Sequence, residues 1–296
     1  NGAAFKKDGK GIYLITNKDS EFNRLAYIDL ATKKLNFIST PISWDIENAV
    51  LSHDGTQLIF ASNENGLSKL YLLSTASNQY QPVANLPVGV ITDIRWTKDS
   101  KSIGFTLNTY NSSADVYEYN LALKSFTRWT TSELGGMDVT ALQAPKLISW
   151  KSFDGKSISG YYYKAASKFT GKRPVIIAIH GGPEGQSRPT FLARSNYFLN
   201  ELGISILYPN VRGSIGYGKS FLDSDNGIKR EESVKDIGAL IDWIATQPDL
   251  DKDRIMVMGG SYGGYMTLAV SYLYSDKIKC SIDIVGISNY NTFLKN

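Results

Sequence analysis

Residues 254–265 read RIMVMGGSYGGY, and this stretch decides the fold of the second half of the chain. An apolar run comes first, Ser261 follows in the pattern Gly-x-Ser-x-Gly, and a helical pattern continues over Tyr262–Tyr274. A serine in so sharp a strand-to-helix turn takes strained backbone angles, and its glycine neighbours avoid collisions. The turn raises the hydroxyl above the sheet at a helix N-terminus, where developing negative charge is favoured. This context predicts that Ser261 is a nucleophile.

A second glycine-rich loop lies about 80 residues upstream, where an apolar run ends in His-Gly-Gly-Pro at residues 180–183. Gly-x-Ser-x-Gly alone would also fit a tight turn whose glycines serve packing only. A His-Gly-Gly loop after the third strand adds one main-chain N–H of an oxyanion hole, and the residue after the nucleophile supplies the other. We therefore predict Gly182 and Tyr262 as the donors, with Gly181 as the fallback.

Apolar strands alternate with helical stretches after Pro145, which is typical of a mainly parallel sheet covered on both faces. We predict strands over residues 147–152, 157–163, 175–179, 204–208, 255–258 and 278–285, and helices over residues 191–202, 233–246 and 262–274. The predicted fold class is thus an α/β-hydrolase fold, a mainly parallel doubly wound sheet, over residues 145–296. The single cysteine, Cys280, is expected to be a buried small hydrophobe.

The first half of the chain repeats itself. A turn followed by two strand-like runs occurs three times, with Asp8, Asp54 and Asp99 in equivalent positions 46 and 45 residues apart. A period near 45 with several short strands is typical of propeller blades. We predict a partial all-β propeller of about three blades over residues 1–144. A non-repeating β-sandwich with coincidental turns is the alternative.

Taken together, these motifs resemble the prolyl oligopeptidase family of serine peptidases, the acylaminoacyl-peptidase-like branch in particular. The resemblance spans residues 145–296 and rests on four stretches in the expected order: residues 150–155, 180–183, 210–218 and 259–265. It implies a propeller that caps the active site and admits short peptides, and peptide cleavage through a covalent acyl-enzyme on Ser261. The stretch 210–218 is similar to the family's loop beside the catalytic serine, in which we expect Arg212 and Tyr217 to order the loop.

The chain departs from the family in its acid and base, which in this fold follow the nucleophile in sequence. No histidine follows Ser261, and the acids that do are Asp276 and Asp283, one in a turn and one too early in a strand. His180 precedes Ser261 and is expected to hold its loop through hydrogen bonds. We therefore expect the triad Asp and His to lie outside this chain, a fragment truncated at both ends that is inactive alone.

Two other functions remain open: a serine esterase of the same fold, and a non-catalytic propeller binding module. The net charge of +4 is spread out, and no Lys/Arg run would follow a phosphate backbone, so nucleic acid is not an expected partner. The expected partners are peptide substrates. We expect no membrane segment, metal or cofactor, and leave the oligomeric state and the compartment open.

Overall fold

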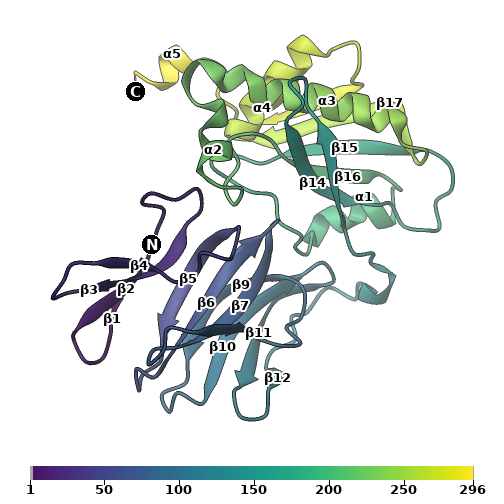
Figure 1. The fold of residues 1–296 in the computed structure, drawn as a ribbon. Coiled ribbons are helices and arrows are strands. Elements are labelled where there is room, and N and C mark those ends of the chain that lie inside the picture. The colour runs from purple at the N-terminus through teal and green to yellow at the C-terminus, as the bar shows by residue number, and fades with distance from the viewer. Residues whose placement is uncertain (1–2, 296) are drawn as a thin grey trace. The chain divides into compact units, whose positions relative to one another are not determined.

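The computed structural model describes residues 3–295, which divide into two compact units (Figure 1). The first comprises residues up to Met137 together with Arg188–Phe191 and Gly216–Lys219. The second comprises Asp138–Ser187, Leu192–Ile215 and the residues from Ser220 onward. Our placement of a domain boundary after residue 144 stays a prediction.

Three four-stranded antiparallel sheets make up the first unit, coloured purple to teal in Figure 1. Within each sheet the strands neighbour one another in chain order. Their bounds are β1 Ala3–Phe5, β2 Gly11–Thr16, β3 Arg24–Asp29, β4 Leu35–Phe37, β5 Asp45–Leu51, β6 Gln57–Glu64, β7 Leu67–Ser74, β8 Tyr80–Pro82, β9 Val90–Trp96, β10 Ser102–Thr109, β11 Ser112–Asn120 and β12 Ser125–Arg128.

The sequence repeat reappears as contacts between equivalent positions of neighbouring sheets. The Trp96 Nε1–H donates to the Val50 oxygen at 2.9 Å, and the Asp54 N–H donates to Ser100 Oγ at 3.1 Å; each pair is 46 residues apart. In each of the three turns the residue after the aspartate has a left-handed φ. The first two repeats have glycine at this position, and the third has Ser100, whose φ is 59°. The repeat is therefore structural, with one sheet per period.

Neighbouring sheets of this unit bury their faces against each other. One apolar cluster joins the first sheet to the second through Tyr13, Leu25, Leu58 and Phe60. Another joins the second sheet to the third, and its buried members include Ile59, Leu70, Ile94 and Phe105. Because alternate residues of β6 face opposite sides, one strand serves both clusters.

The second unit contains a six-stranded sheet in the order β13-β14-β16-β15-β17-β18. Its strands are β13 Lys146–Lys151, β14 Ser157–Tyr163, β15 Arg173–Ile179, β16 Ser205–Asn210, β17 Leu250–Gly260 and β18 Cys280–Ile284. The β13–β14 and β14–β16 pairs are antiparallel, whereas β15, β16, β17 and β18 pair in parallel. The sheet is mainly parallel, as predicted.

Helices cover both faces of this sheet. They are α1 Asn196–Asn200, α2 Lys219–Leu222, α3 Glu232–Thr246, α4 Tyr262–Leu273 and α5 Tyr290–Phe293, with short 3-10 turns η1 Val139–Ala141, η2 Ala193–Ser195, η3 Asp223–Asp225 and η4 Gly227–Glu231. Along β15, Val175 and Ile177 join a core formed with α3 and α4, while Ile176 joins Leu199 of α1 in a separate core. Strand alternation thus divides the core into two layers.

Some sequence-based expectations differ from the structure. The sequence pattern missed the outer strands of the first unit, several of which are only three residues long. Cys280 was expected to be buried and is exposed, as are the other residues of β18. Across residues 3–295, none of the helices combines the length and the apolar character needed to cross a membrane.

Candidate active site

Ser261 occupies a strained and exposed turn between β17 and α4. Its φ of 56° and ψ of −118° lie outside the regions that a residue with a side chain normally adopts. Such strain costs on the order of 1–3 kcal/mol and persists only where the surroundings enforce it. Here the Ser261 N–H donates to the Ile284 oxygen at 3.0 Å, and the Tyr265 N–H donates to the Ser261 oxygen at 3.1 Å. The turn is therefore held from both sides.

The glycines around Ser261 are required for different contacts. A Cβ at Gly259 would overlap the main chain of Gly263, and one at Gly264 would overlap the Asp283 carboxylate. A Cβ at Gly260 would meet its nearest atom, the Ile284 oxygen, at an ordinary 3.6 Å. Gly259 and Gly264 therefore need to be glycine for lack of space, whereas Gly260, a variable position of the motif, does not.

Strand pairing brings the two glycine-rich loops together. Ile179, the last residue of β15, is the register partner of Gly259 in β17. The loop that starts at His180 therefore emerges beside the Ser261 turn. A Cβ built on Gly181 would lie 3.5 Å from the Ser261 Cβ and 3.1 Å from the Gly260 oxygen. A side chain at Gly181 would have ordinary contact with Ser261 and would require the Gly260 oxygen to shift by a few tenths of an ångström.

The predicted oxyanion donors lie on these two loops. Tyr262 is the first residue of α4, so its N–H has no acceptor within the helix. Gly182 adopts a φ of 128°, which is open to glycine. Gly181, the fallback donor, is the loop residue packed against Ser261. The assignment of Gly182 and Tyr262 as donors stays a prediction.

The Tyr262 side chain is buried and anchors the start of α4. Its hydroxyl lies 3.0 Å from both Asp225 Oδ2 and Ser233 Oγ, and the Arg230 guanidinium lies over its ring. Arg230 also pairs with Asp225 at 2.6 Å. Burial raises the pKa of the Asp225 carboxyl, although Arg230 and Tyr262 oppose that effect. This polar cluster fixes the residue that follows Ser261.

His180 is held at both ring nitrogens. Nδ1 lies 2.8 Å from the Gly181 oxygen, and Nε2 lies 2.9 Å from Ser214 Oγ. Burial lowers the pKa of the imidazole, opposed by the hydrogen bond to Gly181, so the ring is neutral at pH 7. Neither nitrogen is available to activate Ser261.

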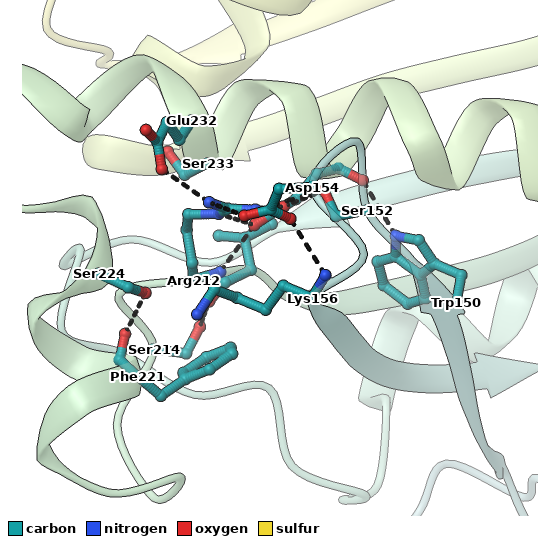
Figure 2. Close-up of polar contacts among 12 residues, drawn as sticks. Trp150, Ser152, Asp154, Lys156, Arg212, Ser214, Phe221, Ser224, Glu232 and Ser233 are labelled. Atoms are coloured by element: carbon teal, nitrogen blue, oxygen red, sulfur yellow. Dashed lines mark hydrogen bonds and ion pairs between the residues drawn. The ribbon is translucent and has the colours of Figure 1, made fainter.

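Arg212 is fully buried at the centre of an ionic cluster (Figure 2). Its guanidinium bonds to Asp236 at 2.9 Å, Asp154 at 3.0 Å and Glu232 at 2.7 Å, and it lies over the Phe153 ring. Hydrogen bonds from Arg212 lower the pKa of Asp154. The cluster connects the β13–β14 turn and α3 to the segment after β16, which is the geometry of a loop-ordering residue.

The structure also describes Tyr217, which was predicted to order its loop, and three residues that were not predicted as site residues. Tyr217 belongs to the segment grouped with the first unit, where its ring packs edge-on against Trp44 at 6.2 Å. His53 is exposed in a turn of the first unit, and Asp276 is exposed in a turn after α4. Asp283 lies in β18 as the register partner of Gly259. In residues 3–295, no group of three or more His, Cys, Asp and Glu side chains is arranged to hold a metal ion.

Sequence reasoning missed Ser214, Asp225, Ser233 and Asp236, which support the site residues. Ser214 lies within the stretch 210–218 that we had quoted, but a lone serine carries no signal of its partner 34 residues away. Asp236 and Ser233 fall on the inner face of α3, where the helical period predicts apolar residues. Buried polar residues at core positions were the available signal.

Comparison with known proteins finds similarity to one family in the C-terminal part of the sequence. Residues 189–296 match the model described as the prolyl oligopeptidase family. The chain is 36% identical to Dipeptidyl aminopeptidase BIII of Pseudoxanthomonas mexicana over 41% of its own length and 17% of that protein. It is 39% identical to Acylamino-acid-releasing enzyme of Arabidopsis thaliana over 36% of its length and 14% of that protein.

Solved structures share the fold over nearly the whole chain. Prolyl oligopeptidase B from Galerina marginata superposes with a TM-score of 0.88 at 17% identity, covering 99% of this chain and 43% of that one. Puromycin hydrolase superposes with a TM-score of 0.83 at 18% identity, covering 95% and 43%. The chain thus spans less than half the length of these relatives. Over residues 189–296, the chain is similar to the prolyl oligopeptidase family.

Proposed function

We propose that the protein is a serine peptidase that cleaves peptide bonds of short peptides through a covalent acyl-enzyme on Ser261. The observation that carries the proposal is the exposed Ser261 in its strained turn, packed against the Gly181 loop. The Ser261 oxygen would attack the scissile carbonyl while the N–H groups of Gly182 and Tyr262 stabilise the oxyanion. The C–N bond then breaks, the amine leaves with a proton, and water hydrolyses the ester.

The proposed reaction requires a general base from outside residues 1–296. The sequence contains two histidines. His53 lies in an exposed turn, and both His180 nitrogens are engaged by Gly181 and Ser214. We therefore infer that the histidine and the acid of the triad are supplied by residues beyond this sequence. Residues 1–296 alone should react slowly with a serine-directed phosphonate.

Peptides are proposed as substrates because residues 189–296 match the prolyl oligopeptidase family model and because relatives such as Dipeptidyl aminopeptidase BIII carry peptidase names. The shared fold supports a finer assignment of the two units. The three four-stranded sheets would be blades of a β-propeller, and the six-stranded sheet would be part of an α/β-hydrolase domain.

The test uses the intact protein and its Ser261→Ala variant with dipeptide and N-acylated amino-acid amides and with simple esters. We expect amide cleavage by the wild type, stoichiometric labelling of Ser261 by a fluorophosphonate, and loss of both in the variant. Cleavage restricted to esters would make the protein an esterase instead. Absence of labelling and of any hydrolysis would favour a binding module and refute the proposal.

A further inference from the structure

The His180 ring links two loops that meet beside Ser261. One loop contains Gly181 and Gly182, and the other contains Ser214. A second bond joins the same loops, because the Ile215 N–H donates to the Gly185 oxygen at 3.0 Å. Gly185 also packs against the ring, since a Cβ there would lie 2.8 Å from His180 Nδ1. The imidazole is therefore held in a fixed orientation.

The hydrogen-bond partners determine which nitrogen carries the proton. The Gly181 oxygen can only accept, so the 2.8 Å contact with Nδ1 requires a hydrogen on Nδ1. In the neutral ring Nε2 is then an acceptor, 2.9 Å from Ser214 Oγ, and the single Ser214 hydroxyl proton is shared between Nε2 and the Val211 oxygen. The Val211 oxygen, 2.7 Å from Ser214 Oγ, remains satisfied because the Ser214 N–H also donates to it, at 3.0 Å.

The His180 tautomer affects the predicted oxyanion hole because His180 contacts the Gly181–Gly182 peptide. The Gly181 oxygen and the Gly182 N–H belong to the same peptide unit. In a trans peptide these two groups point in opposite directions. Because Nδ1–H binds the oxygen, the Gly182 N–H is directed away from His180. The same peptide starts at the Gly181 Cα, and a Cβ built on that atom would lie 3.5 Å from the Ser261 Cβ.

We propose that Ser214 is a positioning residue, which holds His180 as the Nδ1–H tautomer so that the ring fixes the Gly181–Gly182 peptide and aims the Gly182 N–H at the oxyanion. The inference rests on the proposed function of Ser261. Ser214 is suited to this task because it is fully buried and because the neighbouring Arg212 is bonded to three carboxylates. The loop that carries the hydroxyl is therefore rigid.

The first test reads the tautomer directly. In the intact protein, the imidazole nitrogen signals that disappear in His180→Gln assign His180 by NMR, and the exposed His53, assigned in the same way, serves as the internal reference. We expect Nδ1 to carry the proton in the wild type and Ser214→Ala to shift the population toward Nε2–H. Ser224→Ala is the matched control. The Ser224 hydroxyl donates to the Phe221 oxygen, three residues back, at 2.6 Å (Figure 2). Among residues 3–295, no hydrogen bond between Ser224 and a histidine is found. An Nε2–H tautomer in the wild type, or an unchanged tautomer in Ser214→Ala, would overturn the inference.

The second test reads catalysis in the intact protein. Misplacing a catalytic group by about 1 Å can cost on the order of 100-fold, so we expect Ser214→Ala to lower kcat about 10- to 100-fold with little change in KM. Ser224→Ala should leave kcat unchanged. An asparagine amide reaches the position of Nδ1, whereas a glutamine amide reaches that of Nε2, so His180→Asn should retain more activity than His180→Gln.

Equal losses in the two His180 variants, or a Ser214→Ala effect confined to KM, would contradict a positioning role. Thermal unfolding of each variant separates these outcomes from simple loss of fold. The NMR result does not depend on activity. A failure of the proposed function, seen as unlabelled Ser261, is thus distinguishable from a failure of this inference.

Discussion

Gly263, the second residue of α4, packs against the main-chain oxygen of Ile179 at the end of β15. A Cβ at this position would overlap that oxygen and would lie 2.9 Å from the His180 oxygen. The contact sets the distance between the Ser261 turn and the loop predicted to hold the oxyanion.

Replacing Gly263 therefore tests that packing. We expect Gly263→Ala to destabilise the protein by about 1–3 kcal/mol, since main-chain atoms cannot move aside as a flexible side chain can. Gly260→Ala, whose Cβ has ordinary space, should cost less than about 1 kcal/mol. Urea unfolding of both variants checks this, and similar values for the two would contradict it.

Arg212→Met should cost about 3–5 kcal/mol, because Asp236 would remain fully buried without its cationic partner. Arg212→Lys should recover little of this, since one ammonium cannot replace a guanidinium bonded to three carboxylates. The exposed pair Arg254–Asp251 provides the control, and Arg254→Met should cost less than about 1 kcal/mol. Denaturant midpoints measure all three, and a neutral Arg212→Met would argue against a structural role.

Asp115 should make the first unit sensitive to acid. Burial acts to raise its pKa, but hydrogen bonds from Ser112, Thr130, Arg128 and Ser132 lower it to about 2. Since this folded pKa lies below the unfolded value of about 3.9, the stabilisation is present above pH 4 and is lost as the pH falls toward 2. Asp115→Asn should cost about 1.5–3 kcal/mol at neutral pH, and its difference from wild type should shrink on acidification. Urea unfolding between pH 2 and pH 6 gives that difference, with exposed Asp276→Asn as the control; a constant difference would contradict the assignment.

Trp96→Phe tests the link between neighbouring sheets of the first unit. Its buried indole donates to the Val50 oxygen, so the variant should lose about 1–3 kcal/mol. Trp129 provides the control, because its indole donates to Glu118 although 66% of the residue is exposed. Trp129→Phe should therefore cost less than about 0.5 kcal/mol. Thermal melts distinguish the two, and equal shifts would show that the Trp96 bond adds nothing.

The sequence predicted most elements of the second unit because hydrophobic period and glycine placement are local signals. The predicted strand 157–163 and the predicted helix 233–246 coincide with β14 and α3 to within one residue. The outer strands β4 and β8 were missed since three exposed or half-buried residues carry no period. The exposed state of Cys280 was missed because an apolar run does not reveal whether anything covers it.

By itself, the sequence determined that Ser261 stands in a strand-to-helix turn and that the first half is built from three related units, because both follow from spacing along the chain. Only the tertiary structure decided what lies beside that serine. Pairing of β15 with β17 brings Gly181 to it across about 80 residues, and the fold encloses His180 between Gly181 and Ser214. Such contacts join residues distant in sequence, so their geometry exists only once the sheet has formed.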